Sequence, residues 1–246
     1  AWEGYRGAVQ DVFGPRYVGF DPLQIGAPEQ AIMRSSLETF LIRSAQDQAL
    51  RQSLADAAAA YIGLEGVTSE RQLNTDEYLT AMAIGFQTYG EPFLDRLLAV
   101  RTQFDDPVFE QAVAYAIGQN QDPALSERVL ALALSGELGS RETLSIALGQ
   151  MQQPTTQAQT WEWLTTNFET FLDVIPRQRK RSTPGLAASM CSTAARDQLI
   201  ALFETHGALA EGHERSLSQT VERIELCAAL EEAKGAEVRA FFRGGG

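Results

Sequence analysis

The feature that most constrains this chain is a regular spacing of prolines, each placed where a helix can begin. Asp106-Pro107 and Asp122-Pro123 put an acceptor side chain directly before a proline, which is typical of the N-cap and first turn of a helix. Glu91-Pro92 and Gln153-Pro154 are weaker versions of the same pattern. These four prolines are separated by 15, 16 and 31 residues. If each one opens a helix, an antiparallel pair of helices occupies about 31 residues.

Apolar residues recur at helical spacing through most of the sequence, and no run alternates as a half-buried strand does. The clearest stripes lie at 47–62, 156–172 and 214–230, and each predicts one helix. A single helix pair cannot bury its apolar face alone. The repeated pairs therefore predict an all-α solenoid, a superhelix of stacked antiparallel helix pairs, with HEAT-like as the nearest architectural label.

The whole chain, 1–246, is predicted to be a single α-solenoid domain with no internal linker. The helical stack is expected over 30–243. Residues 1–29 are expected to form a short opening helix at about 2–13 and then an irregular connection that contains Pro15, Pro22 and Pro28. The three glycines at 244–246 cannot pack and are expected to fray.

Charge and hydropathy exclude some classes of function. Twenty Lys and Arg against 32 Asp and Glu give a net charge of −12, which repels a phosphate backbone, so we expect no nucleic-acid partner. No stretch approaches the roughly 18 apolar residues of a membrane span, and we expect no signal peptide, because the sequence lacks the basic start and apolar middle of one. The chain begins at Ala1 without a methionine, which favours a processed product or an excised domain and leaves the compartment open.

The sequence offers no catalytic or metal-binding constellation. A zinc peptidase of the common type needs two histidines one helical turn apart with a glutamate between them. The two histidines here, His206 and His213, are seven residues apart and are expected to be surface residues. A Gly-x-Ser-x-Gly nucleophile motif and the glycine-rich phosphate loops are also absent. We therefore assign no catalytic residue and no metal ligand.

The two cysteines, Cys191 and Cys227, each lie in a helix-like run, the first within a helix expected near 186–196. We expect two buried free thiols, because cysteine packs as a small apolar residue and a domain of 246 residues does not need a cross-link. A single disulfide is the alternative.

Three features are candidates for ligand binding. The run Arg177-Gln178-Arg179-Lys180-Arg181 puts four positive charges into five residues of an acidic protein. Such a run is usually a solvated connection, but it also suits a carboxylate such as the C-terminus of a peptide. Trp163 lies off the apolar stripe of its helix and is a candidate for ligand contact. Arg141 is a third candidate for contact with a peptide substrate.

Three passages, in order along the chain, resemble the C-terminal domain of the aminopeptidase N family, the gluzincin aminopeptidases. The first, 17–22 followed by 31–37, is similar to that family's LGW-(D/E)-P passage and the helix after it. The second, 116–144 followed by 161–168, resembles its ALG…DP.L…R..D.L and W.FL..NW passages. The third, 214–227, is similar to its ERSL.Q.LE.I.LC terminal helix. The resemblance extends over nearly the whole chain.

The resemblance implies a non-catalytic domain of a zinc-dependent aminopeptidase. In that family a separate catalytic domain carries Gly-Ala-Met-Glu-Asn and His-Glu-x-x-His, and the C-terminal superhelix closes over its site and encloses the peptide substrate. Neither motif occurs in these 246 residues, so zinc is expected in the missing catalytic domain and no cofactor in this chain. The implied partners are that catalytic domain and the peptide. For a bacterial parent the compartment would be cytoplasmic or periplasmic.

Two other classes of protein remain as alternatives. A stand-alone HEAT-like scaffold would bind a protein or peptide partner in its concave face. An independent hydrolase would need a catalytic site that the sequence does not show. A detached domain is expected to expose an apolar face to its missing neighbour. The opening helix carries such a stripe, Trp2, Tyr5, Val9 and Phe13, which suits either that neighbour or the first layer of the stack itself.

Overall fold

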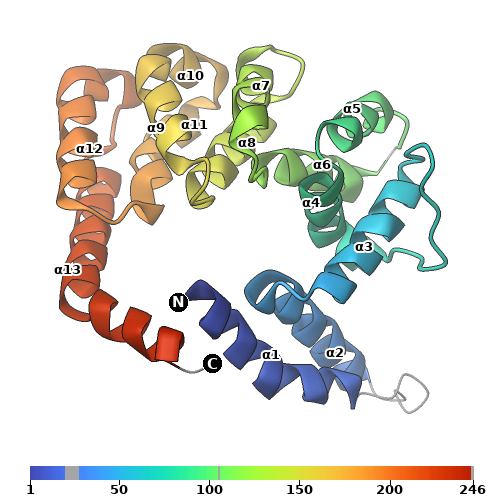
Figure 1. Ribbon diagram of the computed structural model, residues 1–246. Coiled ribbons are helices and arrows are strands. Elements are labelled where there is room, and N and C mark those ends of the chain that lie inside the picture. The colour runs from blue at the N-terminus through green and yellow to red at the C-terminus, as the bar shows by residue number, and fades with distance from the viewer. Residues whose placement is uncertain (20–27, 105, 245–246) are drawn as a thin grey trace.

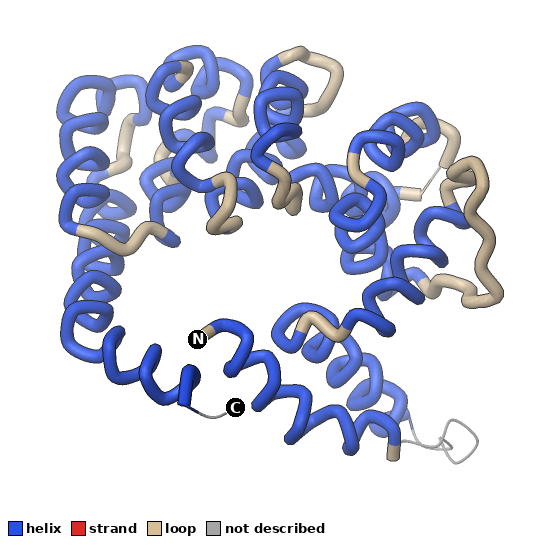
Figure 2. The backbone as a smooth tube through the Cα atoms, in the orientation of Figure 1, coloured by secondary structure: helices blue, strands red, loops and turns tan. Residues whose placement is uncertain are grey.

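The computed structural model describes residues 1–19, 28–104 and 106–244, and within these ranges the regular structure is entirely helical (Figure 2). From the N-terminus the helices are α1 (Trp2–Val18), α2 (Pro28–Phe40), the π-helix η1 (Leu41–Ala45), α3 (Gln48–Tyr61), the 3-10 helix η2 (Thr75–Glu77), α4 (Tyr78–Tyr89), α5 (Glu91–Val100), α6 (Pro107–Gly118) and α7 (Pro123–Leu134). They continue with α8 (Ser140–Gln152), α9 (Gln157–Thr166), α10 (Phe168–Val174), α11 (Arg177–Lys180), the 3-10 helix η3 (Thr183–Ser189), α12 (Thr193–His206), the 3-10 helix η4 (Gly207–Ala210) and α13 (Glu214–Gly244). None of the described helices combines the length and the hydropathy that a membrane crossing requires.

From α3 onward the helices form a two-layer array that curves into a ring, as Figure 1 shows. The inner layer passes from α3 through α4 and α6 to α8, and each of these helices packs on the next. Helices α5, α7, α9 and α12 form the outer layer (Figure 1). The N-terminal helix α1 and the end of α13 meet and complete the ring. The all-α solenoid predicted from the sequence is confirmed.

Aspartate caps start two of the helices, as the Asp-Pro pairs predict. The Asp106 carboxylate accepts a hydrogen bond from a backbone N–H of the first turn of α6 at 2.8 Å, and Asp122 does the same for α7 at 2.9 Å. Pro92 lies in the first turn of α5. The prediction that Pro154 opens a helix is wrong, because Pro154 lies in a turn and α9 begins at Gln157.

Side-chain hydrogen bonds join equivalent positions of successive helix pairs. The Arg51 guanidinium donates to Gln87 Oε1 at 3.0 Å, across 36 residues. Gln87 Nε2 donates to the Gln119 carbonyl oxygen at 2.8 Å, across 32 residues. Gln153 Nε2 donates to Gln119 Oε1 at 2.8 Å, across 34 residues. The structural repeat is thus slightly longer than the 31 residues between Pro123 and Pro154.

Two glycines allow the inner helices α6 and α8 to touch through their backbones. A Cβ atom added to Gly149 would lie 2.6 Å from the Gly118 carbonyl oxygen, which is closer than real Cβ contacts come. A Cβ on Gly118 would lie 2.9 Å from the Ser145 carbonyl oxygen. The buried Gln150 amide donates to the carbonyl oxygens of Gly118 and Asn120, both at 3.0 Å, and so satisfies carbonyls at the end of α6. Only glycine fits this contact.

The apolar core consists of two large clusters along the ring. The first joins α3 to α8 and includes the fully buried rings of Phe86, Phe93 and Phe109. The second joins the end of α8 to α13 and includes Phe168 and Phe171. A small third cluster packs α1 against η1. This distribution is that of a solenoid, in which each layer is covered by its neighbours.

Two of the helices predicted from apolar stripes have other limits in the structure. The opening helix was expected to end near residue 13, but α1 continues to Val18 through Pro15. Asp11 and Pro15 are both exposed, so water can satisfy the carbonyl that loses its partner to the proline. The stripe at 156–172 was expected to be one helix, but it divides into α9 and α10 at Asn167, whose side-chain amide donates to the Trp163 carbonyl oxygen at 2.8 Å.

The prediction of two free thiols is also wrong, because Cys191 and Cys227 form a disulfide with Cα atoms 5.1 Å apart. The helix expected near 186–196 is interrupted, since η3 ends at Ser189 and Ser192 caps α12. Cys191 therefore lies in an extended break beside α13, where it can reach Cys227. Helix α13 itself continues to Gly244 rather than ending near 230.

Some predictions fall on residues that lie outside the described ranges. These are the Asp21-Pro22 part of the irregular connection and of the first resemblance passage, and the last two glycines of the expected frayed tail. Gly244 belongs to α13.

The glycine contact between α6 and α8 predicts a specific loss of stability. Gly149→Ala should lower the free energy of unfolding by about 2 kcal/mol, because the added methyl group meets the Gly118 backbone, which has no flexible end to move. The matched control is Gly7→Ala in α1, where a Cβ meets nothing within 4 Å and the substitution should be neutral or stabilising. Urea unfolding followed by circular dichroism measures both. Equal effects of the two substitutions would contradict the contact.

Candidate functional site

Two adjoining cavities open on the inner side of the ring, with volumes of about 190 Å³ and about 450 Å³. They share Arg43, Gln46 and Gln121, and together they are called the inner cavity below. The smaller part lies against α4 and α6, and the larger part lies between the start of α1 and the turn after α8. Segments far apart in the sequence, from α1 to the turn after α8, therefore line one site on the inner side of the ring (Figure 1).

The inner cavity is lined by cations and amides. Its described lining contains three arginines and no carboxylate. The long polar side chains of the lining are those of Arg6, Arg43, Arg51, Gln46, Gln87, Gln119, Gln121, Gln153 and Tyr115. In a chain with a net charge of −12, this is a local concentration of positive charge and of N–H donors. Such a lining favours an anion.

Neutral partners hold the Arg43 guanidinium in place. Its Nη2 donates to the Tyr115 hydroxyl at 2.8 Å and to the Thr80 hydroxyl at 3.3 Å. The guanidinium carbon lies 5.7 Å from the centroid of the Tyr115 ring. These contacts fix the direction of the side chain but do not neutralise its charge, so Arg43 can still bind a carboxylate.

Arg51 is more deeply placed and also has neutral partners. Its guanidinium donates to the Ile42 carbonyl oxygen at 3.3 Å and to Gln87 Oε1 at 3.0 Å. Burial lowers the pKa of the Arg51 guanidinium, and the positive charge of Arg6 lowers this pKa further. This further lowering arises because the positive charges of Arg6 and Arg51 repel each other. An anion bound beside Arg51 would stabilise its charged form.

Other arginines of the described residues do have acidic partners. Arg71 pairs with Glu38 and Glu77, and Arg128 pairs with Glu91 and Asp95. These pairs tie neighbouring segments of the stack together. The arginines of the inner cavity differ from them because their hydrogen bonds go to hydroxyl, amide and carbonyl oxygens.

One residue that lines the inner cavity has a strained backbone conformation. Gln46 ends η1 in the left-handed region with φ of 52°, and it is the one non-glycine residue of the described chain with a positive φ. This conformation is costly for a side chain with a Cβ and is often found at functional positions.

The basic run that was predicted as a carboxylate site lies elsewhere. Residues Arg177, Arg179 and Arg181 are exposed on and just after the one-turn helix α11. Lys180 Nζ lies 3.8 Å from Asp173 Oδ1. The inner cavity is lined by other residues. The role of the run in binding a carboxylate stays a prediction.

The structure places Trp163 against the apolar core and Arg141 on the surface. Trp163 is half-buried, packs against both large core clusters, and its ring meets that of Phe171 edge-on at 6.2 Å between centroids. Arg141 is exposed in the first turn of α8. Contact of either residue with a ligand stays a prediction, and the structure gives Trp163 a packing role in addition.

The histidines have separate surroundings. His206 Nδ1 lies 3.2 Å from Glu169 Oε1, and the His213 ring stacks on Phe203 with centroids 5.0 Å apart. No three His, Cys, Asp or Glu side chains of the described ranges gather as a metal site requires.

Sequence reasoning missed the arginines of the inner cavity. Arg6, Arg43 and Arg51 are isolated in sequence, and nothing near them marks a site. One signal was available, because glutamines recur at 87, 119 and 153 with the spacing of the repeat. Polar residues at one position of successive pairs indicate a shared face.

The fold and the cavity define the class of protein: an α-solenoid domain with a concave, cation-lined inner face. Residues 1–226 match the family described as ERAP1-like C-terminal domain, and the chain belongs to that family. The predicted resemblance to the C-terminal domain of the aminopeptidase N family is thereby confirmed. Domains of this type are non-catalytic parts of larger aminopeptidase chains. The comparison with curated proteins gives no match.

The packing of Trp163 leads to a test of its role. Trp163→Ala should lower the free energy of unfolding by about 2 kcal/mol, because a half-buried ring that joins two core clusters is lost. Trp2→Ala is the matched control, since Trp2 is 72% exposed and should change stability little. Thermal unfolding of both variants measures the difference. A Trp163→Ala variant of unchanged stability would contradict the packing role.

Proposed function

We propose that this domain closes over the catalytic site of a zinc-dependent aminopeptidase and encloses the peptide substrate in its concave face. The inner cavity holds the end of the peptide that is far from the cleaved bond, its C-terminal carboxylate. The observation that carries the proposal is the set of guanidiniums, Arg6, Arg43 and Arg51, that line a concave cavity together with amides. Family membership supports the aminopeptidase context.

The chemistry of a carboxylate fits this lining. A guanidinium presents N–H donors in a planar fork that matches the two oxygens of a carboxylate. Arg43 and Arg51 are held by neutral partners, so a bound carboxylate would provide their acidic partner. The glutamine side chains of the cavity can donate to the same ligand or to the last peptide group. These contacts are stronger in a concave site than on an open surface, since less water screens them.

The domain acts through binding and enclosure. In this proposal the zinc ion and the residues that activate water would belong to the catalytic domain, where zinc would supply Lewis-acid chemistry at the peptide carbonyl. This chain anchors the far end of the peptide and limits the space around it, which excludes folded proteins and positions the substrate. The family match favours this role over a stand-alone scaffold.

An apolar surface of α1 and α2 is the place where we expect the catalytic domain to pack. Val18 is 81% exposed on α1, and Ile32 and Met33 are 67% and 61% exposed on α2. A cavity of about 730 Å³ beside them is lined mainly by apolar side chains, among them Phe13 and Phe40. Exposed apolar surface of this kind is typical of an interface.

The stripe Trp2, Tyr5, Val9 and Phe13 divides between two environments. Val9 is buried in the small core cluster of the first layer, and Tyr5 and Phe13 pack against this cluster. Trp2 and Tyr5 face the larger part of the inner cavity.

The carboxylate proposal predicts a charge-specific loss of affinity. The double variant Arg43→Gln, Arg51→Gln should bind a short peptide with a free C-terminus at least tenfold more weakly, because each charge-assisted hydrogen bond contributes about 1.5–3 kcal/mol. The same peptide with an amidated C-terminus should bind both proteins equally weakly. Isothermal titration calorimetry of the 246-residue chain with the two peptides measures this difference.

The matched control tests the basic run as the competing carboxylate site. Arg177→Gln, Arg179→Gln also removes two charges, but on the exposed helix α11. It should leave the preference for the free C-terminus unchanged. If this variant loses the preference and the Arg43, Arg51 variant keeps it, the carboxylate site belongs to the run and the proposal for the inner cavity is wrong.

The zinc-dependent context has its own test. The reading frame upstream of Ala1 in the source DNA should encode His-Glu-x-x-His and the methionine-glutamate-asparagine motif of the family. A start codon directly before Ala1 would contradict the proposal of a catalytic domain in the same chain and would favour the stand-alone scaffold.

A further inference from the structure

The long helix α13 has two halves with different surroundings. Its first half packs against α12 and η3, where Ile224 is fully buried and Thr220 is nearly so. Arg196 Nη1 of α12 lies 3.2 Å from Glu225 Oε1 in the same half. After Cys227 the only buried residue described in the helix is Gly235. Residues 228–244, called the closing arm below, therefore extend away from the stack.

The closing arm completes the ring by touching α1. The rings of Tyr5 and Phe242 meet edge-on with centroids 5.6 Å apart. A Cβ atom on Gly4 would lie 1.8 Å from the Phe242 carbonyl oxygen, so the backbones of α1 and the arm are in contact there. Figure 1 shows the two ends of the chain side by side at this point. The ring is closed by this small contact and by no covalent bond at the tip.

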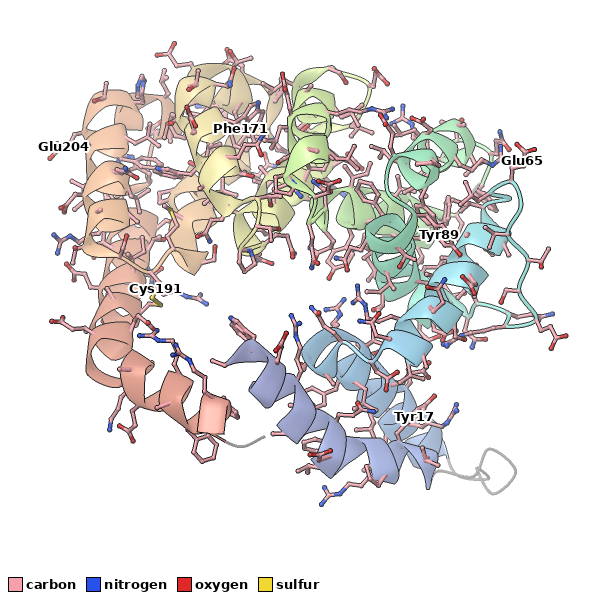
Figure 3. All side chains as sticks on the ribbon, viewed as in Figure 1. Tyr17, Glu65, Tyr89, Phe171, Cys191 and Glu204 are labelled. Atoms are coloured by element: carbon pink, nitrogen blue, oxygen red, sulfur yellow. A yellow bond between two sulfur atoms is a disulfide. The ribbon has the colours of Figure 1, made fainter. Side chains whose placement is uncertain are left out.

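The disulfide lies at the base of the closing arm. Cys227 is the residue directly before the arm, and Cys191 lies in the exposed break between η3 and α12. Both cysteines line a cavity of about 630 Å³, together with Trp2 of α1 and Val238 and Phe242 of the arm. Figure 3 shows the sulfur atoms beside α13, on the side that faces the interior of the ring. The bond is therefore accessible from the gap that the arm closes.

The arm is long enough to amplify a small change at its base. The 17 residues of the arm, 228–244, extend about 25 Å along a helix. A bend of about 10° at Cys227 would move the tip by about 4 Å, which separates the arm from α1. The family match covers residues 1–226, and the arm lies outside the matched residues.

From these observations we propose that the Cys191–Cys227 disulfide is a redox-controlled latch for the ring. With the disulfide formed, the base of the arm is fixed and its tip rests on α1. A dithiol reductant transfers two electrons and two protons to the S–S bond, which breaks into two thiols while the dithiol becomes a disulfide. The base of the arm is then free to bend, and the ring opens between α1 and the arm.

The latch affects the inner cavity through α1. Trp2, Tyr5 and Arg6 of α1 form one wall of its larger part, and the contact with Phe242 holds that end of α1. Opening of the arm would widen the cavity on this side. The effect on peptide entry rests on the proposed function, whereas the opening itself does not.

Hydrogen exchange measured by mass spectrometry tests the latch on the 246-residue chain, before and after treatment with dithiothreitol. We expect amides of the arm and of the first turns of α1 to exchange at least tenfold faster after reduction, with amides of α4, α6 and α8 unchanged. The variant Cys191→Ser, Cys227→Ser should behave as the reduced chain with or without dithiothreitol, which separates the disulfide from other effects of the reductant.

A second pair of variants tests the contact at the tip with the disulfide intact. Gly4→Leu should accelerate exchange in the same two segments, because its side chain meets the Phe242 backbone. Gly7→Leu, where a Cβ meets nothing within 4 Å, should not.

Three results would overturn the latch. These are two free thiols in the air-oxidised chain, equal exchange in the oxidised and reduced chains, or faster exchange throughout the stack, which would make the disulfide a general stabiliser. If exchange shows opening but the affinity for a peptide with a free C-terminus is unchanged by reduction, the latch stands and its link to peptide entry is wrong.

Discussion

The backbone contact between α6 and α8 at Gly118 and Gly149 is the constraint on which the architecture depends. No helix pair in this chain can bury its apolar face alone, so stability comes from stacking each layer against the next. Direct contact of the two backbones sets the distance between α6 and α8. Gln150 then joins the end of α6 to α8 by two hydrogen bonds.

Stacking at this spacing also builds the site. It places the glutamines at 87, 119 and 153 on one face, where they bind each other and Arg51. The carboxylates that pair with Arg71 and Arg128 lie on α2, η2 and α5. The described lining of the inner cavity contains no carboxylate. Positive charge inside an acidic protein favours an anion at the concave face, as the proposed binding of a peptide carboxylate requires. The stacking of the helices thus produces both the concave shape of the inner face and its positive charge.

The sequence predicted what depends on local periodicity and failed where distant segments meet. The Asp-Pro caps, the helix period and the family passages are local signals, and they led to the correct fold. Asn167 broke a continuous apolar stripe because its amide binds a backbone carbonyl, which periodicity does not reveal. The disulfide depends on the packing of η3 against α13, and cysteines 36 residues apart give no sign of it. The inner arginines were missed for the same reason, since Arg6 and Arg43 come together only when α1 packs against η1.

The most direct test of the account is to find where the C-terminal end of a peptide lies on this domain. A short peptide that carries a benzophenone next to a free C-terminal carboxylate can be cross-linked to the 246-residue chain by light, and the modified residues identified by mass spectrometry. The account predicts cross-links in the segments that line the inner cavity, around 43–51, 80–87 and 115–121, and their loss when the C-terminus is amidated. Cross-links confined to 177–181 or to the outer helices, with or without the carboxylate, would contradict it.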